Sequence, residues 1–316
     1  MTTLRMLAAA TAVSLAGITS PGAAQGTYPS REITLVVGYA PGGVTDLQAR
    51  VVAKYLGREL KTGVVVKNMA GAQGTLGQDF VRRAQPDGYT LALVTSSSTA
   101  LSPYLVNDVY EPGDFDYAGG VGIARFGLVV RADAPYRDVG QFVEASKRSP
   151  LFFGSSSAIT SLGFAKLAQA SGGAFEPVNY KSGPEIVTAL LGGYIAALMQ
   201  APNEVMPQIE SGKARLLASA GPARWPSAPE VPTLREAGYD VVIESWGGVA
   251  APRGLPPDVL RTLRAALGRA VADPGMARDL DQLGIDSSPL SGPDFGEKMR
   301  QTFVEAAPVM KAMVKK

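Results

Sequence analysis

Short β-branched runs alternate with longer segments of helical periodicity along most of this sequence. Residues 32–38 read Glu-Ile-Thr-Leu-Val-Val-Gly, and residues 45–60 then carry apolar side chains at helical spacing. The same order recurs as a strand pattern at 64–66, a helix pattern at 75–84 and a strand pattern at 89–94. This alternation predicts an α/β fold with mostly parallel sheets and helices on both of their faces.

A second series of strand and helix patterns follows an extended segment at residues 124–131. Its strands are expected at 151–154, 194–199 and 216–220, and its helices at 141–147, 160–170 and 184–191. Another extended segment, at 241–251, leads to helix patterns at 257–272, 274–283 and 293–313. The chain is therefore expected to pass twice between two lobes. Lobe 1 would contain residues 25–126 plus 248–316, lobe 2 would contain 127–247, and a ligand cleft would lie between them.

The residue types present exclude several classes of site. The 316 residues include no cysteine and no histidine, which rules out disulfides, thiolate or imidazole metal sites and imidazole-based catalytic triads. Neither a Gly-x-Ser-x-Gly nor a Ser-x-x-Lys pattern occurs, so an exported enzyme is a disfavoured alternative. Thirty basic and 28 acidic residues give a net charge of +2, which offers no electrostatic case for nucleic acid. We expect no catalytic residue, cofactor or metal.

The N-terminal residues have the pattern of a secretory signal. Arg5 precedes an apolar stretch of twelve residues, 7–18, and small residues follow at Gly22 and Ala24. We expect residues 1–24 to be a cleaved signal peptide rather than a membrane anchor, because the apolar stretch is shorter than the roughly 20 residues that a span requires. The mature protein is then expected in the periplasm.

Three loops after predicted strands have the chemistry to hold an anion. Pro41-Gly42-Gly43-Val44-Thr45-Asp46 leads into the first helix, with Thr45 as the expected N-cap and Gln48 completing a capping box. Hydroxyls are abundant at residues 95–99 in the first lobe and at 154–161 in the second. A plain glycine-rich turn and ordinary capping serines are the alternatives. Hydroxyl-rich loops on both lobes favour a polar ligand with many acceptor atoms.

Several ordered blocks resemble the signature of the Bug-type extracytoplasmic receptors of tripartite tricarboxylate transporters. The blocks are Tyr28-Pro29, Pro41-Gly42-Gly43-Val44-Thr45-Asp46, Asn68-Met69-Ala70-Gly71-Ala72-Gln73-Gly74-Thr75-Leu76-Gly77, Pro86-Asp87-Gly88-Tyr89-Thr90-Leu91, Leu190-Leu191-Gly192-Gly193, Pro229-Glu230-Val231-Pro232-Thr233, Glu236-Ala237-Gly238 and Ser245-Trp246-Gly247. The resemblance implies a type II periplasmic-binding-protein fold with a two-segment hinge. It also implies capture of a small organic acid between the lobes and delivery to membrane permease subunits; a monomer is expected. A ligand-presenting sensor for a signalling kinase is the alternative.

The resemblance also implies ligand-binding positions. They are Gly43, Thr45 and Asp46 in the first loop, Ser96 and Ser97 in the first-lobe serine loop, Ser155, Ser156, Thr160 and Ser161 in the second lobe, and Tyr180 and Gln200. Gln200 stands where relatives often have an aspartate, which would deprive a ligand amino group of its counter-charge. A dicarboxylate or an aromatic acid without an amine is therefore favoured.

Overall fold

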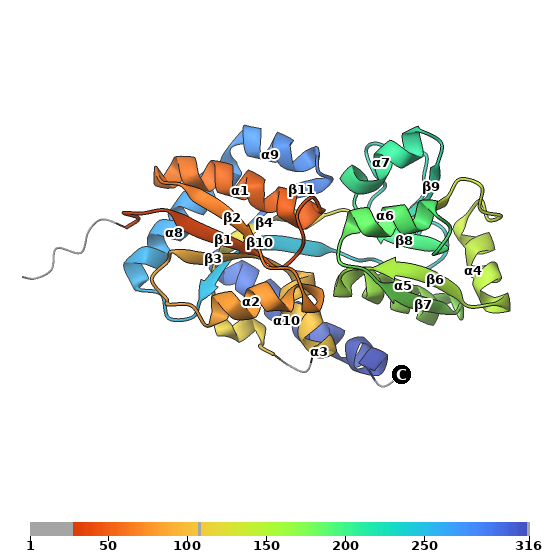
Figure 1. Cartoon of the computed structure of the whole chain (residues 1–316), viewed down its shortest axis with the longest axis horizontal. Coiled ribbons are helices and arrows are strands. Elements are labelled where there is room, and N and C mark those ends of the chain that lie inside the picture. Colours follow the sequence, from red (N-terminus) through yellow and green to blue (C-terminus); the bar gives the residue numbers. More distant parts are fainter. Residues whose placement is uncertain (1–27, 107–108, 315–316) are drawn as a thin grey trace, which may run out of the picture.

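Two β-sheets, each flanked by helices, form two lobes that lie side by side (Figure 1). The computed structural model describes residues 28–106 and 109–314, so the predicted signal peptide at 1–24 lies outside the described residues. Within the described ranges, no helix combines the length and the apolar character needed to cross a membrane. The two-lobed α/β arrangement predicted from the sequence is confirmed.

The first lobe is built on a six-stranded sheet with the strand order β11-β4-β10-β3-β1-β2. Its strands are β1 (Ile33–Val37), β2 (Val64–Asn68), β3 (Thr90–Thr95), β4 (Phe115–Ala124), β10 (Ser245–Pro252) and β11 (Ile285–Ser291). The second lobe has a five-stranded sheet with the order β7-β6-β8-β5-β9. Its strands are β5 (Gly127–Arg131), β6 (Leu151–Ser155), β7 (Phe175–Asn179), β8 (Ala197–Gln200) and β9 (Ala214–Ser219).

Both sheets are mixed, which corrects the expectation that they are mostly parallel. Among the described strands, β1 pairs in parallel with β2 and β3, and β6 pairs in parallel with β7 and β8. The other pairings, β10 with β3 and β4, β11 with β4, and β5 with β8 and β9, are antiparallel. The chain leaves the first lobe along β4 and returns along β10, so these neighbouring strands must run in opposite directions.

Helices cover both faces of each sheet. The longer helices are α1 (Val44–Leu60), α2 (Thr75–Arg82), α4 (Val139–Arg148), α5 (Ala158–Ser171), α6 (Gly183–Leu191), α7 (Pro202–Glu210), α8 (Pro257–Ala272), α9 (Pro274–Asp281) and α10 (Gly292–Val314). Shorter helical turns are η1 (Ala72–Gly74), η2 (Ser97–Leu101), α3 (Ser102–Leu105) and η3 (Pro112–Asp114). In β1, Leu35 and Val37 face one hydrophobic cluster and Val36 faces another, as the alternation of strand side chains requires.

The two connections between the lobes lie next to each other. Residues 125–126 link β4 to β5, and the return segment enters the first sheet at Ser245, the first residue of β10. Ser96 contacts this return segment, because its Oγ accepts a hydrogen bond from the Trp246 N–H at 2.9 Å. The predicted boundary at 126/127 falls between β4 and β5, whereas the one at 247/248 falls inside β10.

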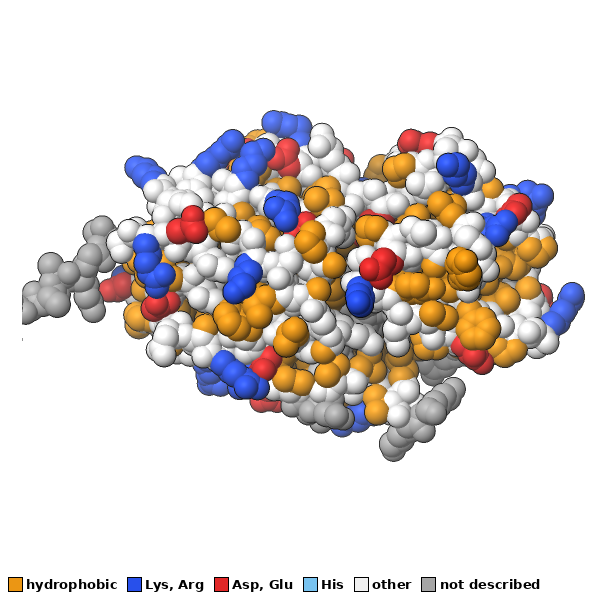
Figure 2. Space-filling model, in the orientation of Figure 1, with side chains coloured by type: hydrophobic (Ala, Val, Ile, Leu, Met, Phe, Trp, Pro, Cys, Tyr) orange, Lys and Arg blue, Asp and Glu red, His pale blue; other side chains and the backbone are white. Residues whose placement is uncertain are grey.

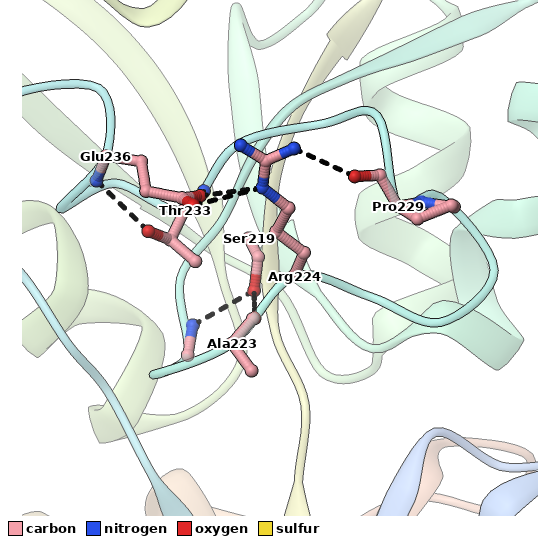
Figure 3. A network of polar contacts seen from close by, with 7 residues as sticks. Ser219, Ala223, Arg224, Pro229, Thr233 and Glu236 are labelled. Carbon is pink, nitrogen blue, oxygen red and sulfur yellow. Dashed lines mark hydrogen bonds and ion pairs between the residues drawn. The ribbon is translucent and has the colours of Figure 1, made fainter.

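The signature block at residues 229–238 organises a long loop of the second lobe (Figure 3). The Thr233 N–H donates to Glu236 Oε2 at 2.7 Å, and the Glu236 N–H donates to Thr233 Oγ1 at 3.1 Å. Arg224 forms an ion pair with Glu236 and also donates to the Pro229 carbonyl oxygen. This block has a structural role, because its polar groups form hydrogen bonds and ion pairs within the loop.

Candidate functional site

A cavity lies between the two lobes, at the carboxyl ends of β1, β3, β6 and β8. It is small, about 50 Å³ counted as the space open to the centre of a water molecule. On the face shown in Figure 2, the two lobes are separated by a notch at the upper edge, and basic and acidic side chains are interspersed over both. The lobes touch across the cavity, because the Ile159 N–H of lobe 2 donates to Ser97 Oγ of lobe 1 at 3.2 Å.

The Pro-Gly-Gly loop turns the chain from β1 into α1 and brings backbone N–H groups to the cavity. Gly42 has φ of +89°, a conformation that favours glycine. The helix N-cap is Gly43, whose extended backbone is followed by Val44 as the first helical residue. This corrects the expectation of a capping box from Thr45 and Gln48. Both of those side chains lie inside the helix, where they line the cavity instead.

Asp46 holds this loop in place and does not line the cavity. Its carboxylate accepts hydrogen bonds from the Gly42 N–H at 3.0 Å, from Asn68 Nδ2 at 2.9 Å and from two nitrogens of Arg50 at 3.0 Å. Burial opposes ionisation of this carboxyl. The hydrogen bonds from Arg50, Gly42 and Asn68 outweigh it, so the pKa of Asp46 is lowered. The structure therefore places Asp46 as an organiser of the loop.

Three helices begin at the cavity. Gly43 and Val44 at the start of α1, Ser157 at the N-cap of α5, and Ser182 and Gly183 at the start of α6 all line it. The N-caps of α1 and α5 make no side-chain capping bond, so the first N–H groups need other acceptors. The Val44 N–H of α1 bonds to Glu204 Oε1 and the Ile159 N–H of α5 bonds to Ser97 Oγ. Helix N-termini with free N–H groups attract anions.

Two glutamine side chains that line this cavity carry amide nitrogens without a partner. Gln48 comes from α1 in lobe 1 and Gln200 from the end of β8 in lobe 2, and each is only 3% exposed. The Nε2 atom of each is buried and has no hydrogen-bond partner among the described residues. A buried polar atom without a partner is costly, so two such donors in one cavity indicate a ligand that supplies acceptors.

The predicted hydroxyl residues divide into two groups. Ser97 and Ser156 line the cavity, together with the predicted residues Gly43, Thr45 and Gln200. Ser155, Thr160 and Ser161 do not, because Ser155 Oγ lies 2.9 Å from Thr160 Oγ1 and 2.8 Å from Ser161 Oγ in a buried cluster. Ser96 is taken up by the hinge contact with Trp246.

Tyr180 also lies outside this cavity. It packs against the hydrophobic cluster of the second lobe and lines a separate shallow hollow that includes Tyr194. The structure thus brings five of the eleven predicted site residues together at the cavity and places six elsewhere. The binding roles themselves stay predictions.

Residues that the sequence argument did not assign to the site also line the cavity. Tyr39 lies at the end of β1, and burial raises the pKa of its hydroxyl, partly offset by hydrogen bonds from Ser97, Thr95 and Ser98. Gln48, which the sequence predicts only as part of a capping box, and Lys181, which follows β7, line the cavity as well. Tyr39 and Lys181 share one signal, a position two residues after the end of a strand, which places a side chain at the carboxyl edge of the sheet, whereas Gln48 lies within α1 and has no such signal.

Glu204, in the first turn of α7, brings a carboxyl group into the cavity from lobe 2. Its Oε1 accepts a hydrogen bond from the Val44 N–H of α1 at 3.4 Å, which bridges the lobes. Its Oε2 is buried without a partner among the described residues. Burial raises the pKa of Glu204 to about 7, although the N–H groups of Val44 and Ala201 act in the opposite direction.

The cavity is suited to binding an anion by neutral donors. In the described part of the chain, no group of three or more acidic side chains could hold a metal ion. What the cavity offers is backbone N–H groups, hydroxyls and glutamine amides, with Lys181 at its rim and Glu204 as the acidic group. These groups can hold and orient a small acid.

Comparison with known proteins gives consistent matches over nearly the whole chain. A family model described as the tripartite tricarboxylate transporter family receptor matches residues 48–313. The UPF0065 protein in the gbd 5′ region of Cupriavidus necator is 34% identical over 301 residues, which cover 93% of this chain and 91% of that protein.

Solved structures match as well. The periplasmic binding protein BugD is 30% identical, with a TM-score of 0.82, and the match covers 90% of this chain and 98% of BugD. The structure of R. palustris Rpa4515 with adipate is 25% identical, with a TM-score of 0.82, and the match covers 90% of this chain and 97% of Rpa4515.

Proposed function

Since this chain belongs to the tripartite tricarboxylate transporter family of receptors, we propose that it captures a small organic carboxylate between its lobes and delivers it to membrane permease subunits. On this proposal the protein works in the periplasm, after cleavage of residues 1–24. The periplasmic binding protein BugD, with which it shares its fold, supports that location.

The two unpartnered amide donors carry the proposal. Gln48 Nε2 and Gln200 Nε2 come from opposite lobes and are both buried at one cavity. A ligand with carboxylate oxygens would satisfy both donors only when the lobes are together. Contacts made to both lobes shift the population toward the closed arrangement, as lobe closure around a ligand requires.

A dicarboxylate is the ligand class that we favour. Helix N-termini whose N-cap side chains make no capping bond face the cavity from both lobes, which suits a ligand with an anionic group at each end. The adipate complex of Rpa4515 supports the same class.

Isothermal titration with C4 to C8 mono-, di- and tricarboxylates tests the proposal. Thr45→Val removes a cavity-lining hydroxyl and keeps the side-chain shape. It should weaken the best ligand, since a hydrogen bond to a charged group contributes about 1.5–3 kcal/mol. The matched control is Thr262→Val in α8, whose hydroxyl bonds to the Asp258 carbonyl oxygen away from the cavity. Native mass spectrometry would show whether an acid co-purifies. Flat titrations with every acid would refute the proposal.

A further inference from the structure

The carboxyl group of Glu204 occupies the position where an anionic ligand would meet α1. Its Oε1 accepts a hydrogen bond from the Val44 N–H, the first N–H of helix α1. The same oxygen packs on the start of α6: a Cβ added at Gly183 would lie 2.1 Å from it, and one added at Gly43 would lie 3.4 Å from it. Glu204 therefore sits at the meeting point of two helix N-termini, one from each lobe.

No cation compensates this carboxyl group among the described residues. Lys181 is the basic side chain that lines the cavity, and it forms no ion pair with Glu204. Glu204 Oε2 is buried and makes no hydrogen bond. The N–H groups at these helix starts favour the ionised form, but the loss of hydration on burial outweighs them and favours the neutral acid.

The other ionisable groups on the elements around Glu204 are bound to partners of their own or lie elsewhere, so we assign the proton to Glu204. On α1, Asp46 is bound by Arg50. In the first turn of α6, Glu185 accepts a hydrogen bond from the Lys181 backbone N–H at 3.0 Å. The turn around Gly284 packs against Pro202 of α7, and the nearby Asp281 and Asp286 both form ion pairs with Arg125. Tyr39 lines the cavity beyond the end of β1, and Glu210 is the last residue of α7.

We propose that Glu204 is a ligand-binding residue that acts as the neutral acid, donating its O–H to a carboxylate of the ligand, so that capture of a dicarboxylate takes up one proton. This inference rests on the proposed function. Two carboxylates side by side in a partly dehydrated cavity repel each other strongly, and sharing one proton converts the repulsion into a hydrogen bond. The protonated form also adds one more neutral donor to a cavity that already binds through neutral donors.

The raised pKa of Glu204, about 7, places the effect within an accessible pH range. Below this pKa the acid form is already present in the free protein. Above it, binding must first restore the proton, and the affinity falls by up to tenfold for each pH unit. Between pH 6.5 and pH 8.5 this amounts to a loss of about 25-fold in affinity.

Titration of the full chain with adipate, in buffers of different ionisation enthalpy, measures the proton directly. At pH 8 the wild type should take up close to one proton for each adipate bound. Glu204→Gln should take up none and should keep its affinity from pH 6.5 to 8.5, because glutamine is uncharged and retains a donor. Glu185→Gln is the matched control, a nearby carboxylate outside the cavity, and it should behave as the wild type does.

The outcomes separate this inference from the proposed function. Adipate binding by the wild type without proton uptake would overturn the role of Glu204 and leave carboxylate capture intact, whatever the stability of the variants. Tighter binding of 2-aminoadipate than of adipate, lost in Glu204→Gln, would overturn it as well, since Glu204 would then be the counter-charge of a ligand ammonium group. If no carboxylate of the panel binds, both proposals fail.

Discussion

Replacing Gln200 with methionine should raise the stability of the ligand-free protein and lower its affinity for the ligand. Methionine is close to glutamine in length and shape, but it has no amide. The Nε2 atom of Gln200 is buried without a partner, so the substitution removes a desolvation cost of about 1–3 kcal/mol. At about 2 °C for each kcal/mol in a chain of this size, the melting temperature without ligand should rise by roughly 2–6 °C.

The affinity for the ligand should change in the opposite direction. If Gln200 Nε2 donates to a carboxylate, its loss costs about 1.5–3 kcal/mol of binding free energy, which makes the dissociation constant about 10- to 150-fold larger. Differential scanning calorimetry of the free protein and isothermal titration with the best acid measure the two effects. Substitution of a residue that only packs in the core would not raise the melting temperature and lower the ligand affinity at the same time.

Gln78→Met is the matched control for Gln200→Met. Gln78 is fully buried too and does not line the cavity. Its Oε1 has no partner among the described residues, but its Nε2 donates to the Leu93 carbonyl oxygen at 3.0 Å and to Ser98 Oγ at 3.3 Å, and methionine would lose both of these bonds. Its substitution should lower stability and leave the affinity near that of the wild type. A Gln200→Met variant that is destabilised yet binds normally would refute the reasoning about unpartnered donors.

Two further predictions concern the framework around the cavity. Because the pKa of Asp46 is lowered in the folded protein, its contribution to stability is present above its ordinary pKa of 3.8 and is lost as the pH falls through the lower, folded-state value. Urea unfolding should therefore show Asp46→Asn to be less stable than the wild type at pH 7, with a smaller difference near pH 3; a pH-independent difference would contradict the role of the Arg50 ion pair. Gly38→Ala should destabilise by about 1–3 kcal/mol, because its Cβ would lie 2.2 Å from the Gly74 carbonyl oxygen, whereas Gly268→Ala within α8 meets no atom within 4 Å and should stabilise by about 0.5–1 kcal/mol. Equal effects of the two alanines in the same unfolding assay would argue against that contact.

Helices such as α8 and α9 were predictable because the signals that mark them, a proline in the first turn and an amphipathic spacing, lie within the helix itself. The observed bounds of α8, Pro257–Ala272, are those that the pattern indicated, and α9 also begins at the predicted Pro274. Proline fits the first turn of a helix, where its missing N–H costs nothing, and amphipathic spacing supplies the rest. Such signals need no knowledge of the partner surface.

Strands β4, β7 and β11 and helix α7 were not predicted, and for β4 the reason lies in packing. β4 contains Gly119, Gly120 and Gly122, which look like turn residues in the sequence. A Cβ added at Gly120 would lie 2.9 Å from the Phe295 ring, and one at Gly248 in β10 would lie 2.5 Å from it. These glycines make room for an aromatic ring of α10, and nothing local to β4 shows that Phe295 will be there.

The cavity was predictable as a place, but the side of each loop that faces it was not. Ser155 and Ser156 are neighbours in sequence and chemically identical, yet successive residues of an extended segment point to opposite faces. Ser155 ends β6 within a buried hydroxyl cluster, while Ser156 lines the cavity. A count of hydroxyls therefore located the loop, while the unpartnered amides of Gln48 and Gln200 became visible only in the folded arrangement. On the proposed function Gln48 and Gln200 are therefore stronger candidates than the buried hydroxyl cluster, because a hydroxyl that is already hydrogen-bonded within the protein has nothing left to offer a ligand.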